Sequence, residues 1–67
     1  MKVTVNGNTR EAPIGSTVDD VVHELAPRSD RGIAVAVNSE VVPRHRWPAT
    51  PLNDGDTIEI LTAVQGG

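Results

Sequence analysis

The chain has 67 residues, a formal net charge of −3 at pH 7, no cysteine, and Trp47 as its single aromatic residue. A chain this short forms one domain, residues 1–67, and buries only about 60% of its unfolded surface. Without cysteine it has no disulfide, thiolate metal site or cysteine nucleophile, and its acidic balance argues against nucleic-acid binding, for which a basic protein is expected.

The N-terminal segment predicts a β-hairpin. Residues 1–5 alternate between apolar and polar side chains, which is typical of a half-buried strand. Asn6-Gly7 is a strong hairpin signal, and residues 10–14 are the expected return strand. A loop of two or of four residues keeps Ala12 and Ile14 on the core face, whereas a loop of three turns both away, so we reject a loop of three.

A single helix is expected after the hairpin, ending near Ala26. Thr17 is the expected N-cap, and Asp20, three residues on, completes a capping-box pattern. Pro27 cannot continue a helix and predicts its end. Apolar residues at helical spacing form one stripe that we expect to face the core: Val18, Val21, Val22 and Leu25.

Two strands are expected after the helix. Residues 33–37 are apolar on both faces, which favours a position inside a sheet. Residues 41–42 start a short strand that Pro43 limits. Residues 44–50 show no periodic pattern, and we expect them to be irregular.

The last strand, residues 57–62, follows a tight turn that ends at Asp56. Its alternation places Ile58 and Ile60 on the core face and Leu61 on the other face. Together the elements predict an α+β domain in which one helix packs across a mixed sheet of about five strands.

The sequence contains no membrane or export signal that we recognise. The longest apolar run, residues 33–37, is far short of the ~20 residues of a membrane span. Met1-Lys2 leads directly into a strand pattern without a signal peptide. We therefore expect a cytoplasmic protein without a membrane partner.

The chain ends on Gly66-Gly67, so its terminal carboxylate has no side chain beside it. Two successive glycines can run extended through a slot too narrow for other residues, and the carbonyl carbon is open to attack. We expect residues 64–67 to form a flexible tail whose reactive group is the Gly67 carboxylate, recognised through Val64, Gln65 and Gly66. The alternative is a frayed end without function, because glycine-rich termini are common.

A set of stretches distributed over the chain carries a more specific signal: Val3–Gly7, Val37–Arg44, Trp47, and Asp54–Val64 closing on Gly66-Gly67. Together they resemble the ThiS family, over essentially the whole length of the chain. Two departures stand out. Gln65 lies where a small residue is expected, and the triplet Arg44-His45-Arg46 is more basic than expected; neither alters the terminal glycines.

The resemblance implies a β-grasp, ubiquitin-like fold with the first strand in the middle of the sheet and parallel to the last. It implies a sulfur carrier of thiamin biosynthesis that has no catalytic residue and binds no cofactor or metal of its own. A partner related to ubiquitin-activating enzymes would use ATP to adenylate Gly67. A cysteine desulfurase or another donor would supply sulfur, and thiazole synthase would consume the resulting thiocarboxylate.

Carboxylate chemistry explains such a division of labour. A free carboxylate is a poor electrophile, because its charge and resonance repel nucleophiles, whereas a phosphate anhydride supplies a good leaving group. The sequence has neither a glycine-rich phosphate loop nor the length for one. We therefore expect the chain to be the substrate and its partners to be the enzymes.

Three other functions stay open. The sulfur carrier subunit of molybdopterin synthase shares this chemistry, although such carriers tend to be longer and more apolar near the end. A protein modifier would conjugate Gly67 to lysines. A ubiquitin-like interaction module would carry an inert tail, and the core does not distinguish it because fold does not fix function.

Six other residues are candidates for a site. His23 and His45 are expected to be solvated, and no spacing around them suggests a metal site. Asp54 fits turn chemistry better than one half of a carboxylate pair with Asp56. Trp47 is expected to cover the core rather than to anchor an interface. Leu61 points away from the core face near the tail, where it either docks a partner or is covered by a neighbouring loop.

Overall fold

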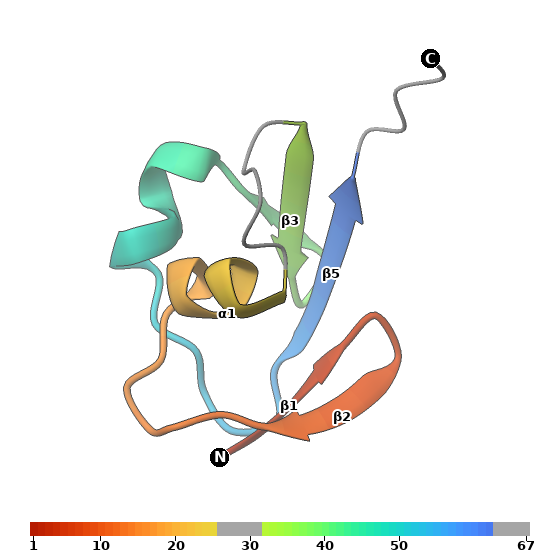
Figure 1. The fold of residues 1–67 in the computed structure, drawn as a ribbon, viewed down its shortest axis with the longest axis vertical. Coiled ribbons are helices and arrows are strands. Elements are labelled where there is room, and N and C mark those ends of the chain that lie inside the picture. The colour runs from red at the N-terminus through yellow and green to blue at the C-terminus, as the bar shows by residue number, and fades with distance from the viewer. Residues whose placement is uncertain (26–31, 63–67) are drawn as a thin grey trace.

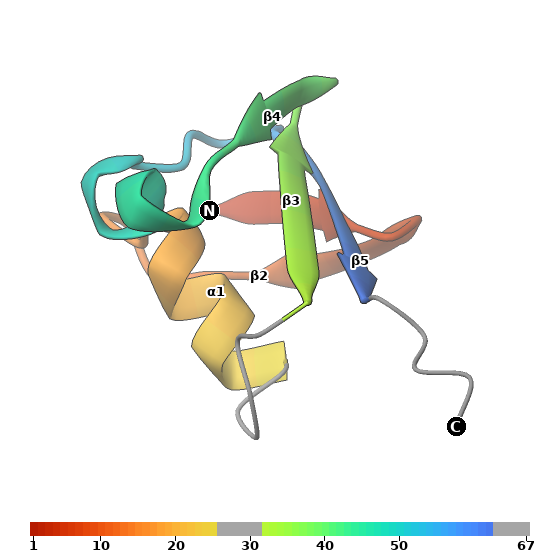
Figure 2. The same cartoon turned by 90° about the horizontal axis from the view of Figure 1, so that it is seen from above.

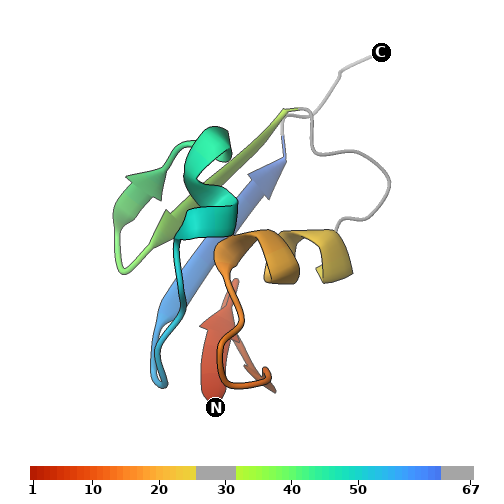
Figure 3. The ribbon, with the colours of Figure 1, turned by 90° about the vertical axis from the view of Figure 1, so that its left-hand side faces the viewer.

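The computed structural model describes residues 1–25 and 32–62 of the chain. In this part, a sheet of five strands in the order β2-β1-β5-β3-β4 carries α1 across one face (Figures 1 and 3). The elements are β1 (Lys2–Val5), β2 (Asn8–Glu11), α1 (Val18–Leu25), β3 (Ile33–Val37), β4 (Glu40–Val42), the 3₁₀ helix η1 (Arg44–Ala49) and β5 (Thr57–Thr62). The expected α+β class, with one helix on a mixed sheet, is confirmed.

β5 occupies the centre of the sheet. It pairs in parallel with β1 through Thr57 and Ile58. It pairs antiparallel with β3 from Ile58 to Thr62, and the two strands run side by side in Figure 2. The expected parallel pairing of the first and last strands is confirmed, but the middle position that we expected for the first strand belongs to β5, with β1 next to it.

The first hairpin has the two-residue loop Asn6-Gly7. Both loop residues have positive φ, 50° and 85°, as a type I′ turn requires. The short loop starts the return strand early, so β2 ends at Glu11 instead of residue 14. Ala12 is buried as expected, and its main chain exchanges hydrogen bonds with that of Met1 at 2.8 and 2.9 Å.

The expectation that Ile14 faces the core is wrong, because its side chain is 90% exposed. The cause is the register of the hairpin. With a two-residue loop, Met1 lies beside Ala12 and β2 ends at Glu11, so Ile14 lies beyond the paired part of the hairpin. The chain instead turns towards α1, where the Ser16 main-chain N–H donates to the Pro13 carbonyl at 3.1 Å.

α1 begins with the expected capping box. The Asp20 carboxylate accepts a hydrogen bond from the Thr17 main-chain N–H at 2.9 Å, and the Thr17 hydroxyl accepts one from the Asp20 N–H at 3.3 Å. Val18, Val21 and Val22 are buried as expected, whereas Leu25 is exposed in the last described turn. The expected helix end near residue 26 lies outside the described residues. Within residues 1–25 and 32–62, no helix has the length and apolarity needed to cross a bilayer.

Residues 44–49 form the 3₁₀ helix η1, so the expectation of irregular structure there is wrong. Pro43 starts the helix at φ −60°, and its carbonyl accepts a bond from the Arg46 N–H at 2.8 Å. η1 places Trp47 in the core with 1% exposure, where its indole N–H donates to the Val42 carbonyl at 2.9 Å. The expected role of Trp47 as a cover of the core is confirmed. The buried apolar core consists of Val3, Val5, Ala12, Val18, Val21, Val22, Val35, Trp47, Leu52, Ile58 and Ile60.

We predict that Asp20→Ala lowers the free energy of unfolding by about 1 kcal/mol, because the first turn of α1 loses its cap. In a domain of this size the loss corresponds to a midpoint about 4–8 °C lower. Thermal and urea unfolding monitored by circular dichroism measure the change. Glu40→Ala, at another exposed carboxylate, is the control and is expected to stay within about 0.5 kcal/mol of the parent. Equal stabilities of the two variants would contradict the capping role.

Candidate functional site

The carboxyl end of β5 lies at the opposite end of the sheet from the N-terminus (Figure 1). Thr62 is the last residue of β5 and pairs with Ile33 of β3. The expected site residues Val64, Gln65, Gly66 and Gly67 lie outside the described residues. The described part of the site is therefore the end of β5 and the sheet surface around it.

An apolar strip lies on the sheet face opposite α1, next to the end of β5. Leu61 is 67% exposed there, and Val41 of β4 is also exposed. The register joins them through two small residues, since Leu61 pairs with Ala34 and Val41 pairs with Ala36. Residues two apart on a strand share a face, so Ala34 and Ala36 continue the strip across β3. We call Leu61, Ala34, Ala36 and Val41 the outer strip.

The exposure of Leu61 excludes its cover by a loop of the described ranges, and docking of a partner there stays a prediction. A loop that covered Leu61 would reduce its exposure well below 67%. Its neighbours Ile58 and Ile60, on the other face of β5, are buried in the core. The alternation of β5 therefore divides the strand into a face that stabilises the fold and a face that is accessible to a partner.

Asp54 and Asp56 serve the turn before β5, as expected. The Asp56 carboxylate accepts hydrogen bonds from the Asn53 main-chain N–H at 2.8 Å and from the Asn38 amide at 3.0 Å. The Asp54 carboxylate accepts one from the Lys2 main-chain N–H at 2.7 Å. Gly55 between them has φ 90°, which favours glycine. Both carboxylates are thus engaged in fixing the start of β5.

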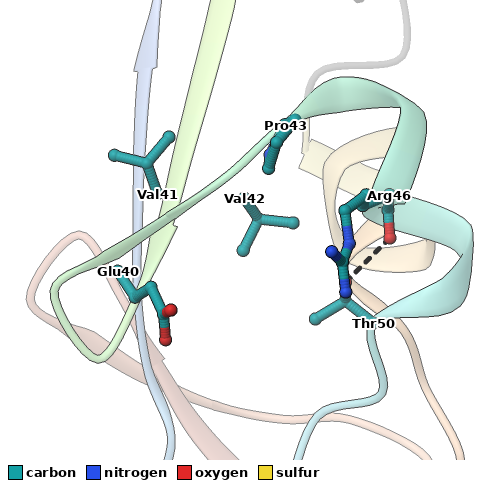
Figure 4. A pocket seen from close by; sticks show the side chains of 6 residues that line it. All are labelled: Glu40, Val41, Val42, Pro43, Arg46 and Thr50. Atoms are coloured by element: carbon teal, nitrogen blue, oxygen red, sulfur yellow. Dashed lines mark hydrogen bonds between the residues drawn. The ribbon is translucent and has the colours of Figure 1, made fainter.

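The basic triplet of η1 does not form one patch. Arg44 and His45 border an open hollow of about 570 Å³ beside Asp19. Arg46 lines a separate hollow of about 200 Å³ between β4 and η1, where the Thr50 hydroxyl donates to the Arg46 carbonyl at 2.7 Å (Figure 4). Arg46 therefore lines a different hollow from the one that Arg44 and His45 share.

The histidines occupy exposed positions, as expected. His23 lies on the solvent side of α1, with its ring nitrogen 3.3 Å from the Asp19 carboxylate. His45 is exposed on η1. Among residues 1–25 and 32–62, no three His, Cys, Asp or Glu side chains are grouped as metal ligands would be. In the described ranges, the Ser16 hydroxyl donates to the Pro13 carbonyl at 2.7 Å, so it serves the start of the helix.

Sequence reasoning found Leu61 but missed its neighbours in the outer strip. The pattern of residues 33–37 does separate a face of large residues from a face of small ones. Which strand lies beside those small residues depends on the register between β3, β4 and β5, and local periodicity carries no information about register between distant strands.

We predict that Leu61→Ala changes the free energy of unfolding by less than about 0.5 kcal/mol, because its side chain is exposed. Ile60→Ala, one residue earlier on the core face, is expected to cost about 2–4 kcal/mol, because it leaves a cavity. Urea unfolding of both variants measures the difference. A loss at Leu61 as large as the loss at Ile60 would show that Leu61 is packed and the outer strip is not available.

Comparison with known proteins agrees with this geometry. The ThiS family model matches residues 3–67. The chain is 31% identical to the sulfur carrier protein ThiS of Escherichia coli K12, over the whole of both proteins. It is 37% identical over its full length to a thiazole synthase of Paramagnetospirillum magneticum, of which it spans only 20%.

A solved structure supports the same assignment. The crystal structure of a thiamine biosynthesis protein, ThiS, from Geobacter metallireducens superposes with a TM-score of 0.82, at 30% identity and over the whole of both chains. The fold and the sequence match thus lead to one family. The chain belongs to the ThiS family, the sulfur carrier proteins of thiamine biosynthesis, which take part in that chemistry as non-catalytic co-substrates.

Proposed function

We propose that the Gly67 carboxylate is the group that carries sulfur for thiazole formation. An activating partner joins this carboxylate to AMP from ATP and releases pyrophosphate. The terminal sulfur of a cysteine-derived persulfide then attacks the acyl carbon, and AMP leaves with one carboxylate oxygen. A thiol reduces the resulting acyl disulfide, which leaves a thiocarboxylate on Gly67 for thiazole synthase.

The observation that carries this proposal is the position of the end of β5. The central strand is held by β3 up to Thr62, and Leu61 of the outer strip is exposed beside that end. The sequence continues for five residues after Thr62, as far as Gly67. A segment of five residues spans at most about 17 Å. A partner that binds the outer strip therefore needs its reactive centre within about 17 Å of Thr62.

The partner classes follow from what the chain lacks and from its relatives. The sequence has no phosphate-binding loop, so ATP is used by an activating enzyme and not by this chain. The match to one fifth of a thiazole synthase supports that enzyme class as the consumer of the sulfur. We expect these encounters in the cytoplasm, with Val64, Gln65 and Gly66 recognised in an extended conformation.

We predict that incubation with an activating enzyme of this class, ATP, cysteine and a desulfurase exchanges one oxygen of the chain for one sulfur. Intact mass spectrometry detects the exchange, and alkylation confirms a thioacid. Deleting Gly67 is expected to abolish the exchange and to leave thermal unfolding unchanged, because the buried apolar core lies within residues 3–60.

The Escherichia coli relative, treated in parallel, shows that the assay works, and omission of ATP is the negative control. An unchanged mass beside a sulfurated control would contradict the proposal and favour an inert interaction module. A series of conjugates of high mass would instead favour a modifier.

We predict that Leu61→Glu lowers kcat/KM for sulfur transfer about tenfold, because it introduces a charge into the apolar strip that a partner has to desolvate. Ile14→Glu is the matched control, since Ile14 is an equally aliphatic and even more exposed residue in the segment between β2 and α1. Steady-state kinetics with the chain as varied substrate compares the two. Equal kinetics for the two variants would exclude the outer strip as a docking surface.

A further inference from the structure

In the part of the chain that the structure describes, the half of β5 nearest the tail pairs with a strand on one side, whereas the other half pairs with strands on both sides. β1 pairs with β5 only as far as Ile58, because β1 ends at the Asn6-Gly7 turn. In the described residues, the strand that pairs with Ile60–Thr62 is β3. The opposite side of Ile60 therefore needs another hydrogen-bonding partner, since main-chain groups of a half-buried strand are costly to leave unpaired.

The side chain of Asn6 supplies that partner. Its amide nitrogen donates to the Ile60 carbonyl at 3.1 Å, and its amide oxygen accepts from the Ile60 N–H at 2.8 Å. The main-chain N–H of Asn6 donates at the same time to the Ile58 carbonyl at 3.0 Å. Asn6 thus imitates the next residue of a β1 strand that has already turned away, and it extends the ladder along β5 by one step towards the tail.

The second hairpin contains an equivalent asparagine at the other end of β5. Asn38 begins the β3–β4 loop with φ 51°, close to the φ of 50° at Asn6. The Asn38 amide oxygen accepts from the Thr57 N–H at 3.0 Å, and its amide nitrogen donates to Asp56. The two asparagines share a turn position, a backbone conformation and a type of contact with β5, but only Asn6 acts beside the tail.

We propose that Asn6 is a positioning residue for the reaction of the C-terminus, through its bonds to Ile60. These bonds fix the path of β5 two residues before Thr62, and thereby the direction in which the chain continues from the sheet and the orientation of Leu61 relative to it. A partner then meets the outer strip and the start of the tail in one arrangement. Such preorganisation lowers the entropy cost of binding. This inference rests on the proposed function of Gly67.

The test compares Asn6→Gly with Asn38→Gly. Glycine accepts the positive φ of both positions without strain. Each variant therefore keeps its turn and loses only the hydrogen bonds of the asparagine side chain. Amide hydrogen exchange followed by NMR is expected to accelerate about tenfold at Ile60 in Asn6→Gly and at Thr57 in Asn38→Gly. Urea unfolding of both variants measures any loss of global stability that the two substitutions share.

Sulfur-transfer kinetics provide the second readout. Asn6→Gly is expected to lower kcat/KM about fivefold more than Asn38→Gly does, mainly through KM. If Asn6→Gly does not fold, Asn6→Asp replaces it, because it keeps the acceptor for the Ile60 N–H and loses the donor to the Ile60 carbonyl.

The possible outcomes separate this inference from the proposed function. Equal kinetics of the two glycine variants, beside normal sulfur transfer to the parent chain, would overturn the positioning role and leave the function of Gly67 intact. Unchanged exchange at Ile60 in Asn6→Gly would overturn it as well. A parent chain that accepts no sulfur would contradict the proposed function. It would also contradict the positioning role of Asn6 in that reaction.

Discussion

The structure depends on the pairing of its central strand, β5, with a strand on each side. β5 lies at the centre of the sheet, parallel to β1 and antiparallel to β3, and it contributes Ile58 and Ile60 to the core. Its start is fixed by the Asp54–Asp56 turn. In a domain that lacks disulfides, with a thin core, this pairing joins the two hairpins into a single sheet. It also determines where the chain emerges at Thr62.

The same strand separates stability from recognition. Because side chains alternate along a strand, β5 faces the core with Ile60 and presents Leu61 to solvent. The small residues Ala34 and Ala36 of β3 widen this surface into the outer strip without adding bulk. A carrier whose chemistry is performed by its partners needs no acid–base pair of its own. In the described part of the chain, Asp20 caps α1, Asp56 fixes a turn, and Arg10 forms an exposed ion pair with Glu24.

Local patterns in the sequence predicted those features that local physics determines. The capping box at Thr17 and Asp20 and the two faces of residues 57–62 depend on neighbours within one or two turns, and both are confirmed. The hairpin register was not predictable in the same way, because loops of two and of four residues satisfy the same alternation; the exposure of Ile14 follows from that choice. η1 escaped prediction because its six residues are too few to show a helical period. Two features arise from pairing between distant segments, which local periodicity does not predict. They are the outer strip and the contact of Asn6 with Ile60, which lie 54 positions apart in the sequence.

The central claim is that the folded domain presents its C-terminus to the activating enzyme. A peptide of the tail alone is therefore expected to be a poor substrate for adenylation. The direct measurement compares the intact chain with a synthetic peptide of residues 58–67 as substrates for adenylation, by ATP–pyrophosphate exchange with the activating enzyme. The peptide keeps the tail and Leu61 but loses the sheet that orders them. The account predicts a kcat/KM for the intact chain at least about a hundredfold higher than for the peptide, because the folded sheet has already met the cost of ordering β5. Equal values for the chain and the peptide would contradict it.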